Sequence, residues 1–209
     1  MVPLSTTQAQ AFTDRMAGRF NAKVVQKERN VAMLAAALAL GAVGLFGPKV
    51  PKPEAFLTEF STTIPDPEDV IANPLRPRAL IALSAKARET PHGQVIVVAH
   101  ECHHADVVAR HWPVAQWFYL ADDHSRAEEE VQAYVVTESV SRRLTGARRS
   151  LEDVLATLAG SYHLGDTAKG LARELLVSAW ASLDEGPIPP ITAAIAAHEI
   201  LDELGVGWA

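Results

Sequence analysis

The sequence contains a single cysteine, Cys102, among its 209 residues. A lone cysteine excludes an internal disulfide framework, and nothing in the cysteine usage indicates an oxidising compartment. Basic residues are also in short supply, since 19 lysines and arginines stand against 25 aspartates and glutamates. Without a broad positive surface the chain lacks the electrostatic basis for binding nucleic acid, so we expect no nucleic-acid partner.

Long apolar stretches are lacking except for VAMLAAALALGAVGLFG, residues 31–47, which carry no charge. A membrane-spanning helix needs about 20 apolar residues, and this stretch is both shorter and rich in alanine and glycine. The 30 residues before it include many polar ones and fit a secretory signal poorly. We therefore predict a buried helix that ends near Gly41, in a soluble protein of the cytoplasm or of a virion.

Aromatic residues make up only 6% of the chain and alanine is abundant, a balance that favours helices over sheets. The predicted fold class is α+β, mostly helical, with a small β element. We expect an N-terminal helical segment that includes the apolar helix (residues 1–50), a central core (51–145) and C-terminal helices packed on that core (146–209). The length suits one domain overall.

Helical periodicity and end signals predict a series of helices, the fourth of them with Ser125 as its N-cap. These helices are expected at residues 5–28, 77–88, about 94–111, 125–144, 151–160, 167–183 and 191–204. A short strand is expected near residues 61–64, where EFSTTIP changes to β-formers, and residues 69–72 are its one candidate partner.

Four of the eight histidines lie in VIVVAHECHHADVVARH, residues 95–111. On a helix, His100 and His104 are four residues apart, so they share a face and can place two imidazole nitrogens on one cation. Glu101 lies about 100° further round the helix, where it can reach water but is poorly placed to be a ligand. This His-Glu-x-x-His arrangement is typical of two zinc ligands with a general base between them. The pair His100 and His103 is a rival that leaves Glu101 without a role.

A histidine-rich helix face without any metal is the plainer alternative. The apolar run QVIVVA, residues 94–99, argues against it, because it would bury the helix and buried imidazoles need partners. Cys102 would point away from the motif as a small packing residue. A second His-Glu pair, His198 and Glu199, is followed by Asp202 in place of a second histidine, so we interpret it as ordinary helix surface.

Catalytic zinc takes a third protein ligand and leaves a further position for water. The extended pattern His-Glu-x-x-His-x-x-Gly-x-x-His would need glycine at Val107 and histidine at Arg110, and His111 is one residue out of register. The third ligand must therefore come from elsewhere. The candidates are the consecutive acids in RAEEEVQAY: Glu128, Glu129 and Glu130.

A His-Glu-x-x-His helix followed by a helix with Glu-x-x-Ala resembles the gluzincin group of zinc metallopeptidases, especially small minimal-domain peptidases of phage and bacterial genomes. The resemblance covers about residues 55–140. It implies a zincin-like fold with a C-terminal helical extension, and it makes the glutamate of the second motif a zinc ligand. Of the three acids only Glu130 has an alanine, Ala133, three residues on. The resemblance thus implies Zn²⁺ held by His100, His104 and Glu130.

The same resemblance implies hydrolysis of a peptide or protein substrate, with Glu101 as the general base. The strand in EFSTTIP would form the edge beside the substrate, and the two prolines of TIPDPED predict that this edge is short or irregular. Peptide hydrolysis also needs a hydrogen-bond donor for the developing oxyanion. The candidates are Tyr134, His163 and His124.

Two other hypotheses stay open. The chain could bind metal yet serve as a structural or interaction protein, for instance in a phage particle, or it could be a peptidase anchored to a membrane by residues 31–47. For the peptidase hypothesis, Asp106 and Asp123 are candidates to orient the ligand imidazoles through hydrogen bonds.

Overall fold

The computed structural model describes residues 2–31, 33–34, 61–162, 164–186 and 188–209 of the chain. In these residues the protein is mostly helical with one small sheet, which confirms the predicted α+β class. The helices include α1 (Thr6–Arg19), α4 (Pro67–Ala72), α5 (Pro91–His111), α6 (Val114–Ala121), α7 (Asp123–Thr145), α8 (Leu151–Ser161), α9 (Asp166–Glu185) and α10 (Thr192–Glu203), with short 3-10 helices η1 (Lys27–Arg29) and η2 (Lys86–Arg88).

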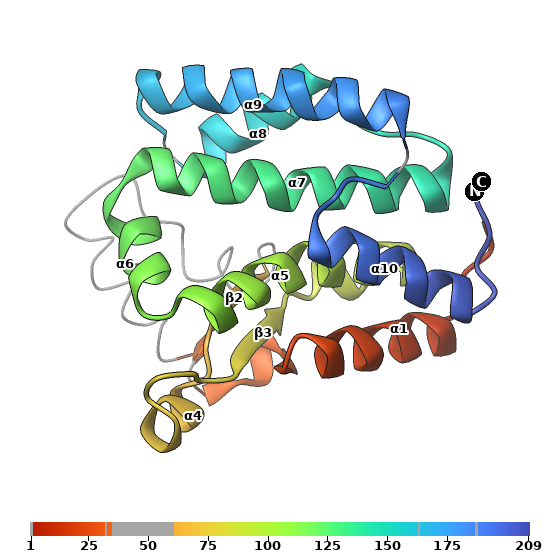
Figure 1. Ribbon diagram of the computed structural model, residues 1–209. Helices are drawn as coiled ribbons and strands as arrows, with labels where there is room; N and C mark the ends of the chain where they lie inside the picture. The colour runs from red at the N-terminus through yellow and green to blue at the C-terminus, as the bar shows by residue number, and fades with distance from the viewer. Residues whose placement is uncertain (1, 32, 35–60, 163, 187) are drawn as a thin grey trace.

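The helices are stacked in rows around α7 (Figure 1). α8 and α9 pack on one side of α7, while α5 and α10 pack on the other, with α1 beyond them. The three helices predicted after residue 150 are confirmed as α8, α9 and α10. Separate apolar clusters fill the two sides of α7, so the long helix is fixed from both directions.

The sheet has three strands, β1 (Ala22–Gln26), β2 (Thr62–Pro65) and β3 (Ala79–Leu83), in the order β1-β3-β2. β1 runs parallel to β3 and β2 runs antiparallel to it. The predicted strand near residues 61–64 is therefore confirmed as β2. β2 is an edge strand, because among the described residues it pairs only with β3.

Two predicted elements beside this sheet are wrong. The helix expected at residues 77–88 is β3 followed by η2, and the strand expected at 69–72 belongs to α4. All of β3 is buried, so its sequence ALIAL shows no alternation, and a short apolar run of this kind does not distinguish a strand from a helix. α4 begins because the Asp66 carboxylate accepts a hydrogen bond from the Glu68 amide at the helix N-terminus.

The helix expected at residues 5–28 begins as predicted but ends early. Ser5 caps α1 by accepting a hydrogen bond from the Gln8 amide at 3.1 Å. After α1 the chain turns through Asn21, whose φ of 47° is one that asparagine tolerates better than most residues. β1 follows, where two consecutive valines favour a strand.

The helices that carry the histidine and glutamate motifs both begin a turn earlier than predicted. α5 has Thr90 as its N-cap, which accepts from the Gly93 amide at 3.0 Å, and Pro91 stands at the first helical position. Residues 90–93, which lie between the helices expected at 77–88 and 94–111, are therefore the start of α5. α7 is capped by Asp122, whose carboxylate accepts from the Ser125 amide at 2.8 Å, so Ser125 is not the N-cap.

The helix predicted within residues 31–47 lies largely outside the described residues. In the part of the chain that the structure describes, no helix is both long enough and apolar enough to cross a membrane. The location in the cytoplasm or in a virion stays a prediction.

Candidate metal centre

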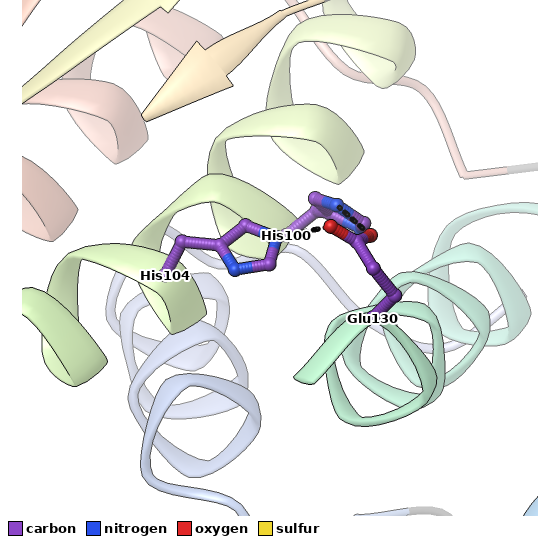
Figure 2. Close-up of side chains that lie close together, drawn as sticks. All are labelled: His100, His104 and Glu130. Carbon is purple, nitrogen blue, oxygen red and sulfur yellow. Dashed lines mark ion pairs between the residues drawn. The ribbon is translucent and has the colours of Figure 1, made fainter. Parts of the chain in front are cut away.

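α5 and α7 lie side by side and bring two histidines against one glutamate (Figure 2). His100 Nε2 lies 3.8 Å from Glu130 Oε2, and His104 Nε2 lies 3.5 Å from Glu130 Oε1. One ligand atom from each residue falls within 4.8 Å of the other two. The structure therefore brings together the three residues that the sequence motifs select as metal ligands.

The donor types of this group are those of a zinc site, and their spacing is wider than a bound ion would give. With metal–ligand distances of about 2.0–2.1 Å, two donors of a tetrahedral site lie about 3.3–3.4 Å apart. The two separations given above reach different oxygens of Glu130, and one atom from each residue brings the three within 4.8 Å, so the side chains would move inward around an ion. Glu130 is 1% exposed, and its Oε2 atom has no hydrogen-bond partner among the described residues. A buried carboxylate oxygen without a donor is costly unless a cation or a proton neutralises it. Two imidazoles and one carboxylate are also a donor set of catalytic zinc sites.

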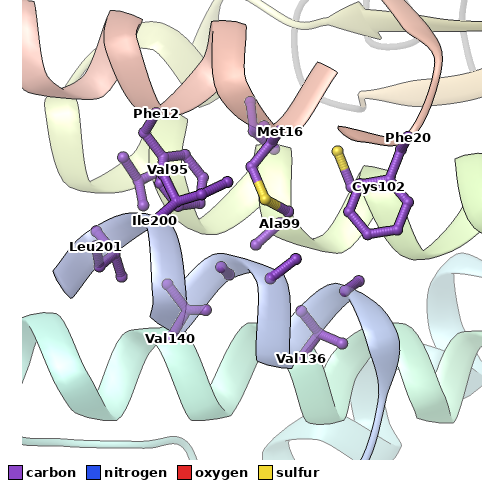
Figure 3. Close-up of a cluster of buried hydrophobic side chains, with 14 of the residues drawn as sticks. Phe12, Met16, Phe20, Val95, Ala99, Cys102, Val136, Val140, Ile200 and Leu201 are labelled. Carbon is purple, nitrogen blue, oxygen red and sulfur yellow. The ribbon is translucent and has the colours of Figure 1, made fainter. Parts of the chain in front are cut away.

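The opposite face of α5 is apolar and fixes the rotation of the helix (Figure 3). Val95, Ala99 and Cys102 are fully buried in a cluster that also contains Met16 of α1 and Ile200 of α10. The prediction that Cys102 is a packing residue is confirmed. Burial raises the pKa of its thiol, so the sulfur stays neutral. Its side chain lies in the apolar cluster and not among the histidines.

His100 is held in the form that can bind a cation. Its Nδ1 atom lies 3.0 Å from the Thr137 hydroxyl, which itself donates to the Ala133 carbonyl at 3.1 Å. Because the hydroxyl proton is already used, Thr137 accepts from His100 Nδ1–H, and Nε2 carries the lone pair that faces Glu130. Burial lowers the pKa of His100 well below its usual value and that of His104 to about 3, so both rings are neutral.

Glu101 lies beside the cluster but belongs to a different environment. It is 5% exposed, and the Thr63 hydroxyl of β2 lies 2.7 Å from its Oε2 atom. Burial raises the pKa of Glu101 to about 7, and the hydrogen bond from Thr63 opposes that rise. A carboxyl group whose pKa lies near neutrality can both take and give a proton at the pH of a cell.

All three tyrosines of the chain lie around Glu130. The Tyr119 hydroxyl donates to Glu130 Oε1 at 2.5 Å, and Tyr162 lies near both Glu130 and Tyr134. The ring of Tyr134 meets His100 edge-on, with centroids 5.2 Å apart. Burial, together with the charge of Glu130, raises the pKa of Tyr134 to about 12, so its phenol stays protonated. Burial also raises the pKa of Glu130 to about 7.

The rival histidine of the motif is paired with a different acid. His103 Nε2 lies 3.3 Å from Glu129 Oε2, and Glu128 is exposed. Two of the three consecutive glutamates therefore contact different histidines of the motif. Glu129 contacts His103, and Glu130 contacts both His100 and His104.

Several residues proposed for supporting roles lie elsewhere. Asp106 forms an ion pair with Arg110 on its own helix, and Asp123 accepts a backbone hydrogen bond at the N-cap of α9. Neither is placed by these contacts to orient His100. His124 is exposed, and His163 lies outside the described residues.

The interpretation of His198 as helix surface is wrong. His198 is 1% exposed, its ring stacks on Trp208 with centroids 5.1 Å apart, and Nε2 lies 2.7 Å from the Ser139 hydroxyl. Arg143 donates to its backbone carbonyl at 2.9 Å. This face of α10 is buried against α7, and Trp208 covers it from the last residues of the chain.

The sequence analysis missed four residues that contact the cluster or its base: Thr63, Tyr119, Thr137 and Tyr162. Thr137 could have been found, because it lies seven residues after Glu130 and therefore on the same face of α7. Thr63 is one of two adjacent threonines on a strand, and alternation leaves open which of them faces inward. No spacing signal connects the two tyrosines with Glu130.

Comparison of the chain with protein-family models, with curated proteins and with solved structures finds no match. The site is therefore interpreted from its own geometry and from the motifs of the sequence.

Proposed function

We propose that the protein is a zinc-dependent peptidase of zincin-like architecture. In this proposal His100, His104 and Glu130 hold the zinc ion and Glu101 is the general base. The proposal is carried by one juxtaposition: two neutral imidazoles face a buried carboxylate across α5 and α7, and a second buried carboxyl group on α5 stands beside them outside the donor set.

The residues of the chain have distinct roles in such a reaction. Bound zinc supplies a Lewis acid that polarises a carbonyl group and acidifies water. Glu101 Oε2 is occupied by the Thr63 hydroxyl, so Oε1 is the atom that takes a proton from the attacking water and later gives it to the leaving nitrogen. Thr137 keeps His100 in the tautomer that leaves Nε2 free to bind.

In this proposal a phenol stabilises the charge that develops on the carbonyl oxygen. Tyr134 lies against His100 and stays protonated, so it can donate a hydrogen bond. We assign this role to Tyr134 and not to Tyr119, whose hydroxyl already donates to Glu130. His163 stays a sequence-based prediction.

The edge strand favours an extended polypeptide as substrate. Among the described residues β2 has no strand on one side, which leaves that side for backbone pairing, and it bears the threonine that contacts Glu101. The strand is short and ends at Pro65, as expected from the prolines around it. A substrate paired with β2 would therefore lie next to the base.

A metal-binding protein without catalysis is the second candidate, and the burial of the site favours it. The side chains of His100 and His104 are 13% and 16% exposed, and that of Glu130 is 2% exposed. Ligands this little exposed leave a substrate little access to an ion, which suits an ion that only holds α5 and α7 together.

Metal analysis and a cleavage assay on the purified full-length protein test both candidates. We expect about one zinc per chain and cleavage of an unfolded protein or a peptide pool, abolished by a chelator and restored by zinc. Zinc without cleavage of any peptide would support the structural role. A protein that takes up no zinc would contradict both.

A further inference from the structure

The edge strand is attached to the general base by a side-chain hydrogen bond. Thr63 on β2 approaches Glu101 on α5 with its hydroxyl 2.7 Å from Oε2 and 3.2 Å from the backbone carbonyl oxygen of Glu101. We infer that Thr63 is a positioning residue, which orients the Glu101 carboxylate for proton transfer. This inference rests on the proposed peptidase function.

The position of Thr63 is fixed by the sheet. In the antiparallel pairing of β2 with β3, Thr63 stands opposite Ile81, which is fully buried. The neighbouring residue Thr62 accepts a hydrogen bond from the buried ammonium of Lys27 at 2.5 Å. Two consecutive threonines thus connect the edge strand with η1 and with α5. The hydroxyl of Thr63 is therefore presented at a defined place and does not follow the movements of a loop.

A glutamate side chain needs such a partner in order to act as a base. Its three side-chain torsions let the carboxylate sample several orientations, and proton transfer requires a single one. The bond to Oε2 selects an orientation and leaves Oε1, which forms no hydrogen bond with the described residues, as the proton acceptor. β2 is also the strand beside which the substrate would lie. The same strand would therefore position both the base and the substrate.

The test compares two substitutions in the zinc-loaded full-length protein. Thr63→Val keeps the shape and the preference for a strand but removes the hydroxyl, whereas Thr63→Ser retains the hydroxyl. On a peptide that the wild type cleaves, we expect Thr63→Val to lower kcat about 10-fold with KM and zinc content unchanged. Thr63→Ser should restore most of kcat. In a Glu101→Gln background Thr63→Val should cause no further loss, because Thr63 acts through Glu101.

Thr157→Val is the matched control, since the Thr157 hydroxyl on α8 donates only to the Asp153 carbonyl of its own helix. Its kcat should equal that of the wild type. An effect of Thr63→Val on KM alone, an unchanged kcat, or a full additional loss in the Glu101→Gln background would overturn the positioning role.

A spectroscopic measurement that does not depend on catalysis tests this inference separately from the proposed function. The infrared carboxyl bands of Glu101, identified by their absence in Glu101→Gln, should shift in Thr63→Val and stay in place in Thr63→Ser. Unshifted bands in Thr63→Val would show that the hydrogen bond is not made and would overturn the inference for an active enzyme too. A zinc-loaded wild type that cleaves nothing contradicts the peptidase, and the positioning role falls with it, whereas the infrared comparison still decides whether the bond exists.

Discussion

Glu101 and Glu130 carry the same functional group and are both buried, yet their neighbours differ. Glu130 faces two imidazole nitrogens, whereas Glu101 receives the hydroxyl of Thr63 and faces no ligand nitrogen in the described structure. At the scale of single residues, the proposed function uses this difference: Glu130 is the carboxylate proposed to bind a cation, and Glu101 is the one proposed to move a proton.

Replacing Glu101 by glutamine should therefore abolish catalysis without emptying the site. The amide oxygen can still accept the Thr63 hydroxyl, so zinc content and melting temperature should stay close to those of the wild type. An amide cannot take a proton from water, and the loss of a general base is typically worth about 10²–10⁴ in rate. The measurements are zinc per chain, thermal unfolding and initial rates on a cleaved peptide.

Glu130→Gln is the control for this prediction. It removes a charged ligand, so zinc affinity itself should fall. Loss of zinc in Glu101→Gln would make Glu101 a ligand and would contradict the assignment of roles.

The residues of the cluster could be predicted because each motif consists of residues only three or four positions apart in the sequence. His100 and His104 are four apart on one helix, and Ala133 three residues after Glu130 singled out one acid among three. The partners of these residues could not be predicted in the same way. Thr63, Tyr119 and Tyr162 come from different segments, and only the packing of those segments on α5 and α7 brings them to the carboxylates.

At the scale of elements, the errors have a common cause. The sequence of β3 is apolar at every position because the strand is covered on both faces, and β1 pairs with it across more than 50 residues of chain. Periodicity records the exposure of a segment, and it cannot record a partner that is distant in sequence. The same limit applies to α10, where His198 follows a surface-like pattern but is covered by Trp208.

The burial of His198 makes the packing of α10 on α7 sensitive to acid. Burial, with the nearby charge of Arg143, lowers the pKa of His198 to about 4 in the folded protein. An unfolded histidine has a pKa of about 6.5, so between pH 6.5 and 4 the unfolded chain binds a proton that the folded chain does not. Above pH 6.5 His198 is neutral in both states and does not lower the free energy of unfolding. As the pH falls from 6.5 towards 4, the free energy of unfolding decreases by up to roughly 3 kcal/mol because of this residue.

Urea unfolding of the wild type and of His198→Gln at several pH values between 4 and 7 measures this contribution. Glutamine can still bond with Ser139 but does not titrate, so the free energy of unfolding should depend less steeply on pH in the variant. The difference between the two proteins isolates the titration of His198 from that of the buried carboxyl groups Glu101 and Glu130. Equal slopes would contradict a buried, neutral His198.

At the scale of the whole molecule, one apolar cluster joins distant parts of the chain. Phe12 of α1, Val95 of α5 and Ile200 of α10 belong to it, and they come from each of the three stretches into which the sequence analysis divides the protein. α5 and α7 pack on each other, and the candidate metal centre lies between them. A ligand that bridges α5 and α7 therefore acts on the stability of the whole fold.

Zinc should accordingly raise the stability of the complete protein. The folded chain presents His100, His104 and Glu130 together, and the unfolded chain does not, so binding favours the folded state by mass action. At a free zinc concentration 100 times the dissociation constant, the free energy of unfolding increases by about 2.7 kcal/mol. Thermal unfolding with and without a chelator should show this increase as a higher melting temperature.

His104→Ala should lose most of this zinc-dependent shift in melting temperature. His103→Ala should keep it, although its own melting temperature can fall because it removes the partner of Glu129. If His103→Ala, and not His104→Ala, abolishes the shift, the cation is bound by the rival pair His100 and His103, and the assignment of Glu101 as the base loses its support.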